Sequence, residues 1–128
     1  MDKSSLLVDI DGPVARLTLN RPDRRNSLSP DLVQALGDAF ESLRENQDAQ
    51  VILLTGAGEK SFCAGGDLGG SGLFAGDGIL KSHHDRAAFS RIFESMNQVG
   101  KPIVARLNGH ALGGGFGLAL AADIVIAA

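Results

Sequence analysis

The sequence contains no tryptophan and no tyrosine, and its only cysteine is Cys63. Without these two aromatic residues, a base-stacking surface for single-stranded nucleic acid is hard to build. The excess of 15 acidic over 12 basic side chains also argues against a nucleic-acid surface. A lone cysteine excludes an internal disulfide and favours a reducing compartment. We therefore expect a cytoplasmic protein with no nucleic-acid partner.

Long apolar runs are also lacking. No stretch is long enough to span a membrane, and the first residues, MDKSSLLVDIDG, hold no sustained apolar segment of the signal-peptide kind. The sequence therefore predicts no membrane partner. Its 128 residues, of which 44% are hydrophobic and 21% charged, suffice for one modest globular domain.

Strand and helix patterns alternate along the chain. Apolar alternation or short apolar runs predict strands at 14–20, 51–55, 103–108 and 123–128. A helix is predicted over 29–46, with Ser29 as its N-cap and Pro30 at its first position. A second helix is predicted over 84–100 and an apolar third one after the glycines at 113–115. This order indicates an α/β fold with parallel pairing.

The last residues, DIVIAA, form an apolar strand with no polar exit. We expect the chain to be a fragment or a processed form of a longer protein, or to be completed by a partner chain.

Two phosphate-binding motifs are rejected. The segment GAGEKS resembles a P-loop, but Glu59 separates Gly58 from Lys60 and breaks the required spacing. No G-x-G-x-x-G fits here or at 113–117, because Ser61 and Leu118 occupy the third glycine position.

The chain has 17 glycines, and two glycine-rich segments stand out. SFCAGGDL (61–68) follows a buried strand, and its uncovered N–H groups can bind a ligand oxygen or a base edge; alternatively it is a turn in which Asp67 caps the next helix. LGGGFGLALAADI (112–124) places glycines at a helix start, where N–H groups without intrahelical partners and the helix dipole hold an oxyanion. Close helix packing explains the same glycines equally well.

Arg21, Arg24 and Arg25 form a basic cluster between a strand and a helix. Such a cluster suits either phosphate contacts or a solvated connection.

Other reactive side chains carry little signal. His83 and His84 are adjacent in a polar loop, which is not the one-face spacing of a helical metal pair, so no metal is expected. His110 is expected to be structural. Cys63 has no base at a recognisable spacing, which argues against a nucleophile.

Taken in order, LNRPDRRNSLS, VILLTGAGEKSFCAGGDL and KPIVARLNGHALGGGFGLALAADIVIAA resemble the enoyl-CoA hydratase/isomerase (crotonase) family. The resemblance runs from about Val14 to Ala128. It implies a spiral of repeated β-β-α units, in which residues 1–128 are the N-terminal part of a single domain whose remainder is missing from this chain. It also implies a homo-oligomer, a trimer or a hexamer.

The resemblance further implies an acyl-CoA thioester as the substrate, with coenzyme A as part of that substrate and no separate cofactor. The backbone N–H groups of Gly66 and Gly114 would hold the thioester carbonyl and stabilise an enolate-like intermediate. The residues that it implies for binding the substrate and its coenzyme A are Arg24, Arg25, Ala64, Gly66, Asp67, Leu68 and Gly114.

The sequence departs from the family pattern at one catalytic position. The first of the two glutamates of typical hydratases would fall at Gly117, which has no side chain to act as acid or base. The second would lie beyond residue 128. Ser90 stands where the family's dehalogenases have a histidine, which argues against dehalogenation.

Three functions remain to be compared. The leading hypothesis is a hydratase or isomerase acting on acyl-CoA esters, inactive as this piece alone. The alternative is a non-catalytic acyl-CoA-binding or assembly subunit of the same fold, which the glycine at 117 favours. RNA binding is a third hypothesis, and the net charge of -3 argues against it.

Overall fold

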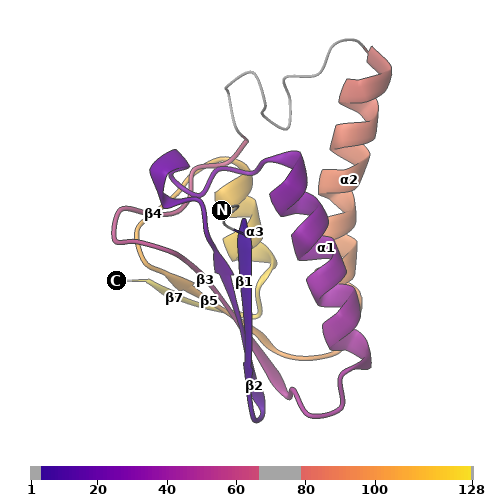
Figure 1. Ribbon diagram of the computed structural model, residues 1–128, viewed down its shortest axis with the longest axis vertical. Coiled ribbons are helices and arrows are strands. Elements are labelled where there is room, and N and C mark those ends of the chain that lie inside the picture. Colours follow the sequence, from indigo (N-terminus) through magenta and orange to yellow (C-terminus); the bar gives the residue numbers. More distant parts are fainter. Residues whose placement is uncertain (1–3, 67–78, 128) are drawn as a thin grey trace.

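The computed structural model describes residues 4–66 and 79–127, and within them the elements repeat in the order strand, strand, helix (Figure 1). They are β1 (Leu6–Asp11), β2 (Val14–Leu19), the 3-10 helix η1 (Pro22–Arg24), α1 (Pro30–Glu45), β3 (Val51–Gly56), β4 (Ser61–Cys63), α2 (Ile79–Gln98), β5 (Ile103–Leu107), β6 (His110–Ala111), α3 (Gly114–Ala121) and β7 (Ile124–Ala127). The expected repetition of β-β-α units is confirmed.

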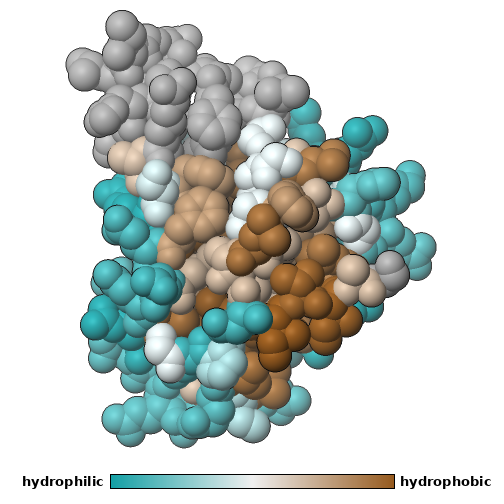
Figure 2. Space-filling model, turned by 180° about the vertical axis from the view of Figure 1, so that it is seen from behind, coloured by the Kyte–Doolittle hydropathy of each residue, from teal (hydrophilic) through white to brown (hydrophobic). Residues whose placement is uncertain are grey.

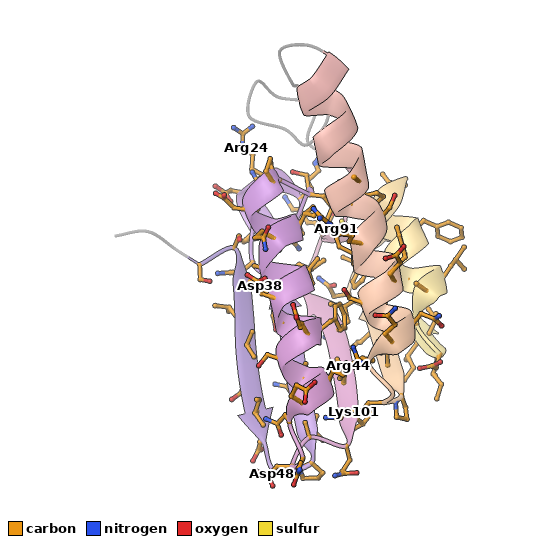
Figure 3. All side chains as sticks on the ribbon, turned by 90° about the vertical axis from the view of Figure 1, so that its right-hand side faces the viewer. Arg24, Asp38, Arg44, Asp48, Arg91 and Lys101 are labelled. Atoms are coloured by element: carbon orange, nitrogen blue, oxygen red, sulfur yellow. The ribbon has the colours of Figure 1, made fainter. Side chains whose placement is uncertain are left out.

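The strands form two sheets. The larger has the order β1-β2-β3-β5-β7, in which β1 is antiparallel to β2 and the other neighbours are parallel. The smaller pairs β4 with β6 in parallel. Helices α1 and α2 lie side by side over one face of the larger sheet (Figures 1 and 3). The first strand of each later unit thus extends the large sheet, and the second strand builds the small one.

Helix α1 shows how the sequence sets these elements. The hydroxyl of Ser29 accepts a hydrogen bond from the Leu32 N–H at 3.2 Å, and Pro30 begins the helix, as predicted. One face of the helix then carries the apolar residues that pack on the sheet. The buried residues of this face are Leu32, Val33, Leu36, Ala39, Phe40 and Leu43.

The predicted strand alternation is also confirmed. Ala15, Leu17 and Leu19 are fully buried in β2, whereas Arg16 is exposed. In β3, the buried Ile52 and Leu54 complete the core beneath α1.

Some elements differ from the prediction. Strand β1 was not expected, and neither were the short strands β4 and β6. Helix α2 begins at Ile79 rather than near residue 84, so His83 and His84 lie within a helix and not in a polar loop. A helix can begin several residues before its apolar periodicity does. A start predicted from that periodicity is therefore too late in the sequence.

One face of the molecule is apolar and uncovered. Figure 2 shows this surface from behind, over α3 and β7. Its exposed residues are Leu112, Phe116, Leu120, Ile124, Val125 and Ile126. None of the helices in the described ranges is both long and apolar enough to span a bilayer.

Candidate functional site

The site begins in the connection between β2 and α1. After η1, Arg25 and Asn26 both adopt left-handed backbone conformations, with φ values of 56° and 55°. Such conformations are uncommon for residues other than glycine and are kept where the surroundings fix them. Here the fully buried Asn26 side chain makes three hydrogen bonds to backbone groups. The connection is therefore held in one conformation.

The segment after β4 is tied to this connection. The N–H of Ala64 donates to the carbonyl of Arg25 at 3.0 Å, and the N–H of Leu28 donates to the carbonyl of Gly65 at 2.7 Å. Gly65 has a φ of +91°, which only glycine adopts readily. Two hydrogen bonds between residues 25–28 and residues 64–65 therefore fix the course of the chain just before Gly66.

The N-terminus of α3 lies against this segment. The N–H of Leu112 donates to the carbonyl of Cys63 at 3.0 Å, just before the helix begins at Gly114. A Cβ added to Gly65 would lie 3.3 Å from the amide nitrogen of Gly114. Two segments that are far apart in the sequence thus bring Gly66 and Gly114 into one neighbourhood.

At each of the three consecutive glycines, the backbone conformation or a close contact disfavours a side chain. Gly113 has a φ of +53°. A Cβ on Gly114 would come within 2.8 Å of the Phe89 ring, and one on Gly115 would overlap the backbone carbonyl of Cys63. The alternative of close packing is therefore part of the explanation, and it brings the helix terminus onto the loop.

Two backbone donors at this junction have no partner within the described ranges. No hydrogen bond there takes the N–H of Gly66 or the N–H of Gly114. The first N–H groups of a helix have no intrahelical partner, and the helix dipole adds positive potential there. Two such donors can bind one oxygen that carries negative charge.

Two phenylalanines of α2 form a wall beside these glycines. The rings of Phe89 and Phe93 pack edge to face, with their centroids 5.2 Å apart. The Phe93 ring lies 3.5 Å from the position that a Cβ on Gly117 would take. A Cβ at Gly117 would therefore make an ordinary contact, but this sequence places neither an acid nor a base there. Ser90, on the same helix, is exposed to solvent.

A pocket of about 550 Å³ opens beside the loop. Arg25 and Ala64, two of the residues expected to bind the substrate, both line it. Lys60 and His110 also line it, although the sequence had suggested only a structural role for His110. Arg24 is exposed and points away from the fold (Figure 3). Four titratable side chains line this cavity, because Glu59 lies on its wall together with Arg25, Lys60 and His110. Basic side chains outnumber the one carboxylate, so the cavity suits an anionic group.

Two of the predicted site residues, Asp67 and Leu68, lie outside the described residues. Cys63 is fully buried, and this burial raises the pKa of its thiol to about 11, with a backbone hydrogen bond at Gly65 acting in the opposite direction. A thiol that stays protonated at neutral pH is a poor nucleophile, in line with the sequence argument.

Asn26 and Asn108 were not predicted as site residues. Both side chains donate to the carbonyl oxygen of Ser61, each at 2.9 Å. An asparagine in a connection is ordinarily taken as a turn former. The one available signal was position, since Asn26 directly follows the basic cluster and Asn108 lies between β5 and the second glycine-rich segment.

Repeated β-β-α units, with a glycine loop packed against a helix N-terminus, are the arrangement of the crotonase fold. A family model described as enoyl-CoA hydratase/isomerase matches residues 9–128. The chain belongs to the enoyl-CoA hydratase/isomerase family.

Individual relatives agree with this assignment. A carnitinyl-CoA dehydratase of Salmonella arizonae is 38% identical over 124 residues, which are 97% of this chain and 46% of that protein. The crystal structure of an enoyl-CoA hydratase from Bacillus anthracis matches with a TM-score of 0.88 and 38% identity, over 96% of this chain and 47% of that one. A monofunctional enoyl-CoA isomerase from M. smegmatis matches with a TM-score of 0.79 and 31% identity, over 98% and 50% of the two chains. The chain therefore spans about half the length of these relatives.

Proposed function

We propose that this chain supplies the carbonyl-binding part of an enzyme of the hydratase/isomerase type that acts on acyl-CoA thioesters. One observation carries the proposal. The N–H groups of Gly66 and Gly114 have no partner among the described residues, while those of the neighbouring Ala64 and Gly115 are hydrogen-bonded. Fixed donors left unused at one junction are what an oxyanion hole requires.

In this proposal, the thioester oxygen accepts both hydrogen bonds. Negative charge gathers on that oxygen when a base takes a proton from the carbon next to the carbonyl and the electrons of the C–H bond form an enolate. Donors that are already in place stabilise this charge without reorganising, and the loss of one such donor costs roughly 3 kcal/mol of barrier.

The coenzyme A part of the substrate is assigned to the loop side. Arg24, Arg25, Ala64, Asp67 and Leu68 are proposed to line its nucleotide end. The pocket that Arg25 and Ala64 share, with Lys60 on its wall, supports this assignment because guanidinium and ammonium groups bind phosphates.

The acid or base is proposed to lie beyond residue 128. Gly117 carries no side chain that can move a proton, and the relatives are about twice as long as this chain. Residues 1–128 are then the N-terminal part of one domain, inactive alone and cytoplasmic, which assembles with further copies as a trimer or a hexamer.

The second candidate is a non-catalytic acyl-CoA-binding or assembly subunit. Gly117 favours it, since a Cβ there would meet the Phe93 ring at an ordinary 3.5 Å and yet the position carries no acid or base.

The test uses two variants of Gly114 and crotonyl-CoA. Gly114→Pro removes the N–H at the first position of α3, where proline is well tolerated. Gly114→Ala adds the same Cβ next to Phe89 but keeps the N–H. Both variants share the contact with Phe89, so we expect titration calorimetry to show that the proline variant binds about tenfold or more weakly than the alanine variant. Equal affinity of the two variants would reject the oxyanion hole.

Turnover separates the two candidates. Loss of the conjugated thioester absorbance is followed with the chain alone and with the chain in whatever assembly intact-mass spectrometry detects. Turnover by an assembly that contains a longer or second chain supports the enzyme. Tight binding by every assembly with no turnover supports the non-catalytic subunit.

A further inference from the structure

The side chains of Asn26 and Asn108 hold the connection between β3 and β4 from two sides. Both Nδ2 groups donate to the carbonyl of Ser61 at 2.9 Å. The amide of Asn26 also donates to the carbonyl of Ala57 at 3.0 Å, and that of Asn108 to the carbonyl of Gly58 at 2.9 Å. We call these two side chains the asparagine clamp.

The other end of each amide is used as well. The Oδ1 atom of Asn108 accepts the N–H of Gly56 at 3.1 Å, and that of Asn26 accepts the N–H of Arg21 at 2.8 Å. A Cβ on Gly56 would lie 2.9 Å from both clamp amides and 2.6 Å from the carbonyl oxygen of Phe62. The clamp therefore packs tightly against the backbone at Gly56. This packing fixes both the orientation of the two amides and the course of residues 56–61.

The clamp lies directly upstream of the unused donor at Gly66. Ser61, its shared acceptor, is the first residue of β4, and the chain passes from β4 to Gly66 in three residues. On the far side, the Leu28 N–H holds the carbonyl of Gly65. Gly66 has no hydrogen bond of its own among the described residues. Its position therefore depends on ties made by its neighbours.

We propose that Asn26 and Asn108 are positioning residues for the carbonyl-binding site, which they act on through Ser61 and β4. This inference rests on the proposed function for the identity of the bound group. The clamp sets where the Gly66 N–H lies relative to Gly114, and it takes no part in the chemistry. It also joins the two halves of the site, because one asparagine comes from the β2–α1 connection and the other from the β5–β6 connection that leads to α3.

The test substitutes Asn108, which is half-buried, because a carboxylate at the fully buried Asn26 would unfold the chain. Asn108→Asp keeps the shape and the acceptor for Gly56 but removes both donated hydrogen bonds. Asn46→Asp is the matched control. Its Oδ1 atom accepts the N–H groups of Asp48 and Ala49 at the far end of α1, and aspartate keeps both hydrogen bonds.

The first readout is amide hydrogen exchange in the ligand-free chain. Ala64, whose N–H bonds to Arg25, reports on the loop, and Ile52, whose N–H bonds to the carbonyl of Pro102, reports on the core sheet. We expect Asn108→Asp to speed exchange at Ala64 about tenfold more than at Ile52, because a local opening precedes global unfolding. The control variant should change neither. Equal acceleration at both amides would show a merely structural role and overturn the proposal.

The second readout is the carbonyl stretch of crotonyl-CoA labelled with carbon-13 at the thioester, at saturation. Two donors on the oxygen lower this frequency, and we expect a smaller lowering in Asn108→Asp than in the control variant. Equal lowering in both variants would overturn the positioning role. If Asn108→Asp shows the exchange effect at Ala64 but the wild-type chain leaves the frequency unshifted, the proposed function is rejected and the clamp is confined to holding the loop.

Discussion

The backbone of Gly115 packs directly on the backbone of Cys63. A Cβ on Gly115 would overlap the carbonyl oxygen of Cys63 and lie 2.7 Å from its carbonyl carbon. Neither partner is the end of a flexible side chain, so neither can move aside without shifting β4 or α3. The site geometry and the stability of the fold therefore depend on the same contact.

Gly115→Ala is expected to destabilise the chain by about 2–3 kcal/mol, because overpacking of backbone against backbone cannot relax through a rotamer change. Gly117→Ala, two residues along the same helix, is the matched control. Its Cβ would meet the Phe93 ring at an ordinary 3.5 Å, and alanine's higher helix propensity would add up to about 1 kcal/mol. Urea unfolding of both variants checks this. Similar midpoints for the two would contradict the packing argument.

Removal of the α1 N-cap gives a second prediction. Ser29→Ala loses the hydrogen bond from the Leu32 N–H and should lower the free energy of unfolding by about 1 kcal/mol. Ser42→Ala, at an exposed position within the same helix, should change it by less than about 0.5 kcal/mol. A thermal melt that lowers Tm equally for both would argue against a capping role.

The other end of α1 is held by Lys101. Its ammonium group donates to the carbonyls of Leu43 and Asn46, and Figure 3 places it beside the end of the helix. Lys101→Met should cost about 1.5–2 kcal/mol, as expected for hydrogen bonds from a charged group. Arg44→Met removes an exposed charge from the same last turn and should cost only about 0.5 kcal/mol. Denaturant titrations distinguish the two effects, and equal losses would mean that charge alone is responsible.

The stability of the chain should fall at alkaline pH because of Cys63. Burial raises the pKa of this thiol from 9.0 to about 11 in the folded chain, so the unfolded chain loses its proton first. The contribution is complete below pH 9 and is lost as the pH rises towards 11, to an extent of about 3 kcal/mol. Urea midpoints at pH 8 and pH 10.5 should differ less in Cys63→Ala than in the wild type. Alkylation of the native thiol at pH 8 should also be slow, and rapid labelling there would contradict its burial.

The apolar surface over α3 and β7 should bind the dye ANS. Leu120 and Ile126 are 64% and 56% exposed, and a contiguous patch of this kind is rare on isolated monomers. Leu120→Lys together with Ile126→Lys is expected to lower the fluorescence of bound dye severalfold. Leu7→Lys, at a site 46% exposed on the opposite edge of the sheet, is the control and should leave most of it. A uniform loss would place the dye elsewhere.

Local signals in the sequence were enough to predict much of the fold. Ser29 and Pro30 marked the start of α1, and the alternation of Leu17 and Leu19 with Arg16 marked β2, because caps and periodicity act within a few residues. Strand β1 was not predicted from the sequence. Its apolar residues Val8 and Ile10 are exposed, so it lacks the buried face that an apolar alternation would indicate. It exists as a strand through its pairing with β2. The short strands β4 and β6 exist through their pairing with each other.

The candidate site likewise combines residues with a local sequence signal and residues that only the fold brings together. The two glycine-rich segments could be found because glycine is conspicuous and because their order resembles one family. Asn26 and Asn108 could not be found, since their role depends on a carbonyl that only the fold brings within reach. The lining of the pocket by Lys60 is likewise a product of tertiary structure.

The asparagine clamp has a consequence for how the chain folds. Five of its six hydrogen bonds join residues separated by 31 to 52 positions, and the strands beneath it pair in parallel through long crossovers. Non-local pairing of this kind slows folding, since the entropy of closing each loop is lost before the contacts are gained. A ribosome-bound chain therefore cannot complete the clamp until Asn108 has emerged and β5 has joined the sheet. Gly66 leaves the ribosome much earlier. Its N–H reaches its final position only after the clamp has formed.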